Sequence, residues 1–272
     1  MPKVRLDLLL VERGLVESRA LAQALIMAGE VRVDGQVVIK PATTVDVGVH
    51  VDLEQGPRFV SRGGEKLDAA LEAFGIAVKD RICADVGAST GGFTDCLLQR
   101  GAARVYAIDV GKGLLHWRLR NHAGVVVMEQ MNARYIDALP EPVSLITIDA
   151  SFISLKILLP VVSKWLVHSA TATGTGSQGG IIALIKPQFE AGRKQVSRGD
   201  GVIRDAQVHR QVLVGVLNFA ESIGLRVRGL IRSPLLGPKG NMEFLAWLAE
   251  GALSESPSAL IEKALEGLEA QD

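Results

Sequence analysis

Hydrophobic residues follow two different patterns along the 272-residue chain. Near the start, apolar positions at helical spacing come before apolar positions at strand spacing. Ser18 is a candidate N-cap for a helix that ends at Gly29, and the Asp-Gly dipeptide at residues 34–35 predicts a tight hairpin turn. Residues 45–53 alternate between apolar and polar positions, as expected of one half-buried strand. We therefore predict a small α+β domain over residues 1–54.

The second pattern begins after residues 55–62, a segment with glycine and proline that we interpret as a linker. From there, β-branched runs alternate with helical patterns, which indicates an α/β domain: a doubly wound, Rossmann-like parallel sheet covered on both faces. We assign residues 63–252 to this domain and residues 253–272 to an acidic C-terminal tail, expected to form a solvated amphipathic helix. The predicted strands lie at residues 82–86, 105–108, 125–128, 145–148 and 181–185.

Composition does not by itself indicate a binding partner. The chain has 30 Lys+Arg and 30 Asp+Glu, a formal net charge of zero, so a nucleic-acid partner must be argued from local charge. Its longest apolar runs fall short of the roughly 18 residues that span a bilayer, and its two cysteines and five histidines lack metal-ligand spacing. We expect a cytoplasmic protein with free thiols, no membrane partner and no metal.

A glycine-rich turn after the first strand of the second domain is the most informative segment. Its glycines let the backbone bend sharply beside a ligand, and Asp109 ends the next strand about 20 residues later, where an acid can bind a ribose diol. The alternative is a tight turn without a ligand. Because the turn lacks the G-x-G-x-x-G spacing that serves a pyrophosphate and begins with Asp85, which suits a methionine ammonium group, we favour S-adenosylmethionine over a dinucleotide. The candidate cofactor-binding residues are Asp85, Gly87, Ala88, Ser89, Thr90, Gly91, Gly92, Phe93, Asp109, Val110, Asn132 and Asp149.

Three charged residues are predicted at the same edge of the sheet. Asp149 ends the fourth apolar run, Lys186 ends the fifth, and Glu243 opens the last apolar stretch. Taken alone, Asp149 is also consistent with a helix-capping acid, and Lys186 with a solvated strand end. Together they indicate a functional cluster, because a charge flanked by apolar strand residues costs free energy unless it has a partner.

The ordered motifs resemble the TlyA (hemolysin A) family of ribosomal RNA 2′-O-methyltransferases. The resemblance implies an S4-type RNA-binding domain followed by a methyltransferase domain of the FtsJ (RrmJ) type, with S-adenosylmethionine as cofactor. It also implies methylation of cytidine in 16S or 23S RNA, or both, within ribosomal subunits, by a catalytic tetrad of Lys66, Asp149, Lys186 and Glu243. The motifs are RLD at 5–7, SRA at 18–20, AGEVRVDG at 28–35, KP at 40–41, VSRGGEKL at 60–67, DASFIS at 149–154, IKPQFE at 185–190 and GPKGNMEFL at 237–245.

RNA binding by the first domain requires that its basic residues share one face. Residues 1–62 hold eight basic and eight acidic side chains, so the count alone gives no excess of positive charge. A second basic group follows Lys186 and is better placed beside the predicted active site. The candidate RNA-binding residues are Arg5, Arg19, Arg32, Lys40, Arg62, Arg193, Lys194 and Arg198.

Within the tetrad, we expect Lys186 to act on the ribose 2′-hydroxyl, as a base or as a charge that stabilises the developing alkoxide. Asp149 and Glu243 are expected to orient the two lysine ammonium groups. A reaction at a 2′-hydroxyl requires RNA and excludes DNA. Three alternatives stay open: a non-catalytic RNA-binding protein that keeps the fold, a haemolysin, and an NAD-dependent oxidoreductase that binds ribose through Asp109.

Overall fold

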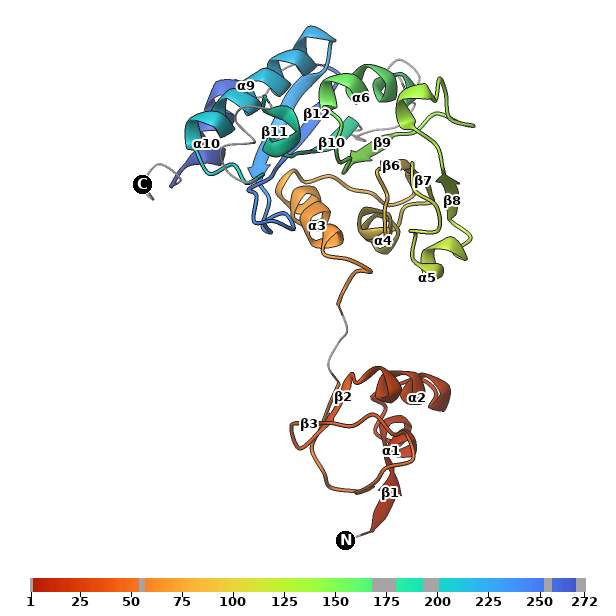
Figure 1. Ribbon diagram of the computed structural model, residues 1–272. Helices are drawn as coiled ribbons and strands as arrows, with labels where there is room; N and C mark the ends of the chain where they lie inside the picture. Colours follow the sequence, from red (N-terminus) through yellow and green to blue (C-terminus); the bar gives the residue numbers. More distant parts are fainter. Residues whose placement is uncertain (1, 54–56, 168–179, 193–200, 252–255, 268–272) are drawn as a thin grey trace. The chain divides into compact units, whose positions relative to one another are not determined.

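The computed structural model describes residues 2–53, 57–167, 180–192, 201–251 and 256–267. The chain divides into two compact units, Met1–Arg58 and Phe59–Asp272 (Figure 1). The first unit contains β1 (Lys3–Arg5), α1 (Leu6–Glu12), α2 (Arg19–Ala28), β2 (Val31–Val33), β3 (Gln36–Val37), β4 (Thr44–Asp46) and β5 (Val51–Leu53).

Two local signals predicted from the sequence, a helix cap and a hairpin turn, are present in the first unit. The Ser18 hydroxyl accepts a hydrogen bond from the Leu21 N–H at 3.2 Å and begins α2, which ends at Gly29 in the left-handed conformation. The predicted hairpin joins β2 to β3, with positive φ at both turn residues. The prediction of one strand over residues 45–53 is wrong. A turn closed by Val49 N–H to Asp46 O (3.1 Å) separates β4, which pairs with β1, from β5, which pairs with β2.

The second unit is built on a seven-stranded sheet in the order β11-β12-β10-β9-β6-β7-β8. The five strands predicted from the sequence are parallel neighbours, whereas β12 runs antiparallel to both β10 and β11. The sheet is therefore mixed, because the chain turns back directly from β11 into β12 without a crossover helix. The strands are β6 (Ile82–Val86), β7 (Arg104–Asp109), β8 (Val125–Glu129), β9 (Leu145–Ile148), β10 (Gly180–Ile185), β11 (Arg226–Arg232) and β12 (Phe244–Ala249).

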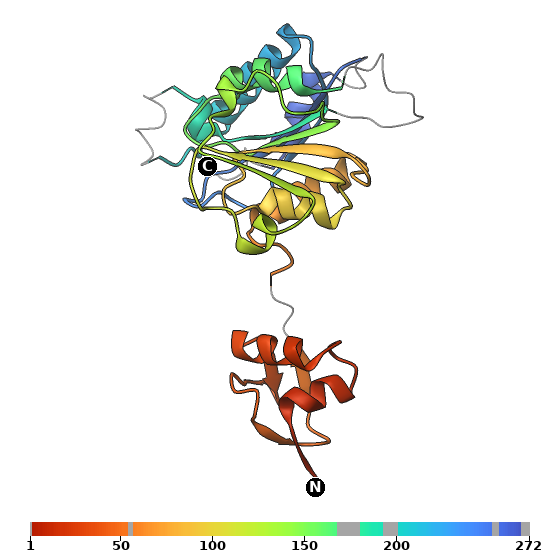
Figure 2. The same cartoon turned by 90° about the vertical axis from the view of Figure 1, so that its right-hand side faces the viewer.

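Helices cover both faces of this sheet. Helices α6, α9 and α10 lie on one face and α3, α4 and α5 on the other (Figure 1, Figure 2). Each face buries its own apolar cluster against the strands. The helices are α3 (Gly63–Ala73), α4 (Gly92–Gln99), α5 (Trp117–Arg120), α6 (Leu155–Val162), α7 (Pro187–Glu190), α9 (Ala206–Ser222) and α10 (Pro257–Leu265), with short 3₁₀ turns η1 (Ala133–Tyr135) and η2 (Ser163–Trp165).

Two predicted boundaries differ from the structure. Phe59, predicted to lie in the linker, is 2% exposed and packs in the core of the second unit. The acidic tail is not a separate solvated helix, because Leu260, Ile261 and Leu265 of α10 are buried in the core beside β11. In both cases the favourable free energy of burying large apolar side chains explains why the segment packs in the core. Among the described residues, no helix is long and apolar enough to cross a membrane.

Candidate active site

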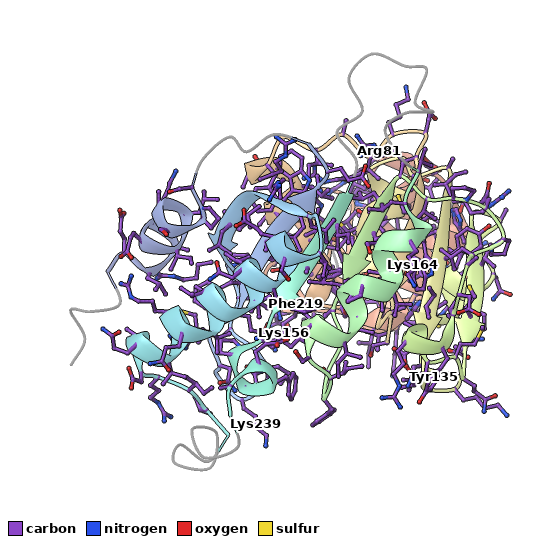
Figure 3. The ribbon with its side chains drawn as sticks, turned by 90° about the horizontal axis from the view of Figure 1, so that it is seen from above. Arg81, Tyr135, Lys156, Lys164, Phe219 and Lys239 are labelled. Atoms are coloured by element: carbon purple, nitrogen blue, oxygen red, sulfur yellow. The ribbon has the colours of Figure 1, made fainter. Side chains whose placement is uncertain are left out.

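The four residues of the predicted tetrad line one cavity of about 660 Å³ in the second unit. The cavity lies at the carboxyl ends of the parallel strands, where open α/β sheets bind ligands. Lys239, which lines the cavity, and Arg81, which precedes β6, lie at opposite edges of the unit (Figure 3). Asp149 follows β9, Lys186 follows β10, and Glu243 precedes β12, so three neighbouring strands bring these residues together.

The tetrad forms two ion pairs. Lys66 Nζ lies 2.6 Å from Glu243 Oε2, and Lys186 Nζ lies 2.6 Å from Asp149 Oδ1. Each lysine side chain is 10% exposed and the Glu243 side chain 1%. Pairing offsets the desolvation of these charges. Ser151 Oγ accepts a further hydrogen bond from Lys186 Nζ at 3.0 Å, a contact that the sequence analysis missed.

Glu243 also presents an acceptor without a donor. Its Oε1 is buried and has no hydrogen-bond partner among the described residues, although the side chain lines the cavity. Gly237 lies directly against it: a Cβ at that residue would stand 2.5 Å from Oε1. A buried carboxylate oxygen of this kind is costly unless a ligand donates to it.

The predicted glycine-rich turn forms one wall of the same cavity. Gly87, with φ of 84°, packs so closely on the segment after the neighbouring strand β9 that a Cβ would stand 2.7 Å from Asp149 O. A Cβ on Gly92 would stand 2.9 Å from Gly64 N. The turn thus has no room for side chains at these glycines, and its backbone is free to approach a ligand. Of the predicted cofactor residues in this turn, Gly87, Ala88, Ser89, Thr90, Gly92 and Phe93 line the cavity, whereas Gly91 packs against the Leu115 and Leu119 side chains.

Asp85 occupies a different position from the one predicted. Its carboxylate is fully buried and accepts hydrogen bonds from Thr94 Oγ1 (2.7 Å) and Thr147 Oγ1 (3.1 Å), and it does not line the cavity. Burial raises the pKa of Asp85 to about 7, and the negative charge of Asp149 adds to this increase. The expected direct contact with a ligand ammonium group is therefore wrong for this structure: the carboxylate supports the turn from behind.

The remaining predicted cofactor residues stand beside the cavity rather than in its lining. Asp109 ends β7, and its carboxylate accepts hydrogen bonds from the N–H groups of Ser89 (2.8 Å) and Gly111 (2.7 Å). Val110 is 68% exposed, and Asn132 caps η1. All three occupy the carboxyl edge of the sheet, so their predicted contact with the adenosine part of a cofactor stays a prediction.

Glu129 is an organising residue that the sequence analysis missed. It ends β8 opposite Asp109, accepts hydrogen bonds from the N–H groups of Gly113 (2.8 Å), Leu114 and Leu115, and pairs with Arg120. These interactions, with Arg120 as the largest, lower the pKa of Glu129. Its position at a strand end, matching that of Asp109, was the available signal.

In the first unit, two candidate RNA-binding residues meet at Asp7, which the sequence analysis did not single out. Arg5 donates to Asp7 from Nε and Nη2, both at 2.9 Å, and Arg19 donates from Nε at 3.0 Å. The Arg5 hydrogen bond is the largest cause of the lowered pKa of Asp7. The buried carboxylate holds both guanidinium groups at one surface, since the arginine side chains are 41% and 51% exposed.

The other predicted basic residues are more dispersed. Lys40 is exposed beside Pro41, whose carbonyl accepts the Asp7 N–H at 3.2 Å, and Arg32 donates to Gly35 O at 3.2 Å. Arg62 is exposed and lines the cavity. Arg193, Lys194 and Arg198 lie outside the described residues. Among the residues that the structure describes, no group of three or more His, Cys, Asp or Glu side chains is placed to hold a metal ion.

Comparison with known proteins identifies the family of each unit and a relative of the whole chain. Residues 59–250 match the model of the FtsJ-like methyltransferase family, and residues 4–51 match the S4 domain. The 16S/23S rRNA (cytidine-2′-O)-methyltransferase TlyA of Mycobacterium tuberculosis is 45% identical over 268 residues, covering 97% of this chain and 95% of the relative.

Two solved structures share the fold. A suspected hemolysin from Streptococcus thermophilus superimposes with a TM-score of 0.71 at 42% identity, covering 99% of this chain and 96% of the other. A suspected S-adenosylmethionine-dependent methyltransferase from Listeria monocytogenes has a TM-score of 0.51 at 15% identity, covering 71% of this chain and all of the other. At that identity the second match shows a common fold alone.

Proposed function

Because the chain belongs to the FtsJ-like methyltransferase family and carries an S4 domain before it, we propose that it methylates the ribose 2′-hydroxyl of a cytidine in ribosomal RNA, with S-adenosylmethionine as methyl donor. The observation that carries this proposal is the pair of lysine–carboxylate contacts in one cavity, beside a glycine-rich turn. An intact tetrad of this kind favours an enzyme over a protein that only binds RNA.

The residues present fit the proposed cofactor. Gly87 and Gly92 line the cavity without side chains, and Asp109 lies at the adjoining strand end. These residues would hold S-adenosylmethionine, which when bound supplies a methyl group already activated on a sulfonium. What the protein must add is alignment of the attacking oxygen and help with the loss of its proton.

The tetrad provides that help. Lys186 Nζ is fixed by Asp149 Oδ1 at 2.6 Å and Ser151 Oγ at 3.0 Å, so its charge is held at one point of the cavity. There it stabilises the negative charge that grows on the 2′-oxygen. Glu243 Oε2 accepts a hydrogen bond from Lys66 Nζ, so this carboxylate holds the second ammonium group at the cavity.

The first unit supplies affinity for the RNA. Arg5 and Arg19 each use part of the guanidinium group on Asp7 and keep other N–H donors for phosphate oxygens. With such a substrate we expect the protein to act on ribosomal subunits in the cytoplasm, and we expect DNA, which lacks the 2′-hydroxyl, not to be methylated.

Transfer of a tritiated methyl group to ribosomal subunits that lack the modification tests the proposal. We expect the wild-type protein to label the RNA, and Lys186→Ala to reduce labelling by at least about 100-fold, as expected when an electrostatic stabiliser is removed. Binding of S-adenosylmethionine to the variant, measured by calorimetry, should change little. Lys164→Ala, at an exposed lysine on η2, is the matched control and should label normally. Equal labelling by wild type and Lys186→Ala would contradict the assignment.

A further inference from the structure

Two buried side chains fasten residues 201–203 next to the cavity. Asn241 Nδ2 donates to Gly201 O at 2.9 Å, and Asn241 Oδ1 accepts from Ile203 N at 2.9 Å. The His209 ring contacts Ile203 O through Nε2 at 3.2 Å. Both backbone groups of Ile203 are therefore bound by side chains, one from the turn before β12 and one from α9.

The residues that make these contacts are buried from solvent. Asn241 is 3% exposed, Ile203 5% and His209 2%. A carbonyl oxygen only accepts, so His209 donates from Nε2, and its Nδ1 has no partner among the described residues. The neutral ring with its proton on Nε2 makes this contact, and burial favours that form by lowering the pKa of His209. The Phe244 ring packs edge-on against the His209 ring, with the two ring centroids 5.8 Å apart.

The fastened segment belongs to the substrate side of the cavity. Gly201 and Asn241 line it together with Glu243, two residues along the chain, whereas the glycine-rich turn of the proposed cofactor site comes from β6. Immediately after Ile203 the chain presents Arg204, which is exposed. Through Asn241, residues 201–203 therefore connect the chain next to Glu243 with the exposed Arg204.

We infer that Asn241 and His209 are positioning residues that hold residues 201–203 as the RNA-facing wall of the active site and thereby place Arg204 against the phosphate backbone of the substrate. This inference rests on the proposed function. It predicts that loss of the clamp weakens the interaction with RNA and leaves the cofactor site intact.

Steady-state methylation and direct RNA binding test the clamp. Asn241→Ala should raise KM for ribosomal subunits, and Kd for the same subunits, about tenfold, the change expected for lost hydrogen bonds of modest strength. Calorimetric Kd for S-adenosylmethionine should stay within about twofold. His209→Gln keeps a donor for Ile203 O and should restore most of the affinity that His209→Leu loses. Asn218→Ala, at an exposed position of α9, is the matched control and should change none of these values.

A double-mutant cycle separates positioning from simple destabilisation. If the clamp acts through Arg204, Arg204→Ala should weaken RNA binding in the wild type and add almost nothing in Asn241→Ala. Additive effects of the two substitutions would overturn the inference, as would an equal loss of cofactor and RNA affinity. The Kd for RNA can be measured without methyl transfer. An absence of methylation by the wild type would therefore contradict the proposed function, and the RNA-binding measurements would still support or overturn the role of Asn241 and His209.

Discussion

Gly87→Ala tests the contact between the glycine-rich turn and the tetrad most directly. Gly87 has φ of 84°, and a Cβ there would stand 2.7 Å from Asp149 O and 2.9 Å from Asp149 C. Both obstructing atoms are backbone, so no side-chain rotation relieves the clash. The turn and the segment that carries Asp149 must separate, and this moves the carboxylate that holds Lys186.

The structure sets the size of the effect. A left-handed φ costs alanine about 1 kcal/mol relative to glycine, and forcing an extra carbon into a packed site costs about 1–3 kcal/mol more. Gly224→Ala is the matched control, because Gly224 has φ of 90° and no atom within 4 Å of the position that a Cβ would take. The difference between the two variants isolates the clash from the backbone strain.

Calorimetry and thermal unfolding provide the assay. Since 1 kcal/mol shifts Tm by about 2–4 °C in a unit of this size, we expect a loss of about 2–4 °C for Gly224→Ala and of about 4–16 °C for Gly87→Ala. Binding of S-adenosylmethionine should be retained by the first variant and lost by the second. If Gly87→Ala binds the cofactor like wild type and unfolds no earlier than the control, the close approach argued from the structure is refuted.

Three further substitutions test other parts of the account. Asp85 has a pKa of about 7 in the folded protein against an ordinary 3.8, so the folded state keeps a proton that the unfolded state releases. As pH rises from 4 to 7, the wild type should therefore lose stability to urea relative to Asp85→Asn by on the order of 4 kcal/mol, with no relative change above that window. Parallel pH profiles of the two proteins would contradict a buried carboxyl group that retains its proton. Asp7→Asn should weaken binding of ribosomal RNA by about three- to tenfold, because Arg5 and Arg19 lose the charge that orients them; unchanged affinity in a filter-binding assay would show that this carboxylate does not organise the surface. Phe59→Ala should destabilise the second unit by about 3–5 kcal/mol, measured by urea unfolding, and a loss below about 1 kcal/mol would return this residue to the linker.

The sequence predicted those features that depend on local chemistry. The Ser18 cap and the left-handed Gly29 are signals readable within a few residues, and the structure contains both. The five parallel strands follow from β-branched runs between helical patterns. The tetrad was identified by motif order, and the structure shows what motif order cannot: the pairing of Lys66 with Glu243, 177 residues apart in the chain.

Features that depend on tertiary burial were missed or misassigned. Asp7 and Asp85 are both fully buried, although an aspartate in a sequence pattern indicates exposure. The charge-rich segment at the C-terminus contains the apolar stripe of α10, and only its packing beside β11 makes it part of the core. Asn241 gave no signal, because an asparagine in a glycine-containing turn is ordinary until its two backbone partners are known.

Mass spectrometry of the modified nucleotide tests the central claim most directly. Ribosomal subunits lacking the modification are incubated with the protein and S-adenosylmethionine, and the RNA is digested to nucleosides and to mapped fragments. We predict one added methyl group on the ribose 2′-oxygen of a cytidine, present with wild type and absent with Lys186→Ala. A methyl group on a base, or RNA left unmodified by a protein that binds the cofactor, would contradict the account.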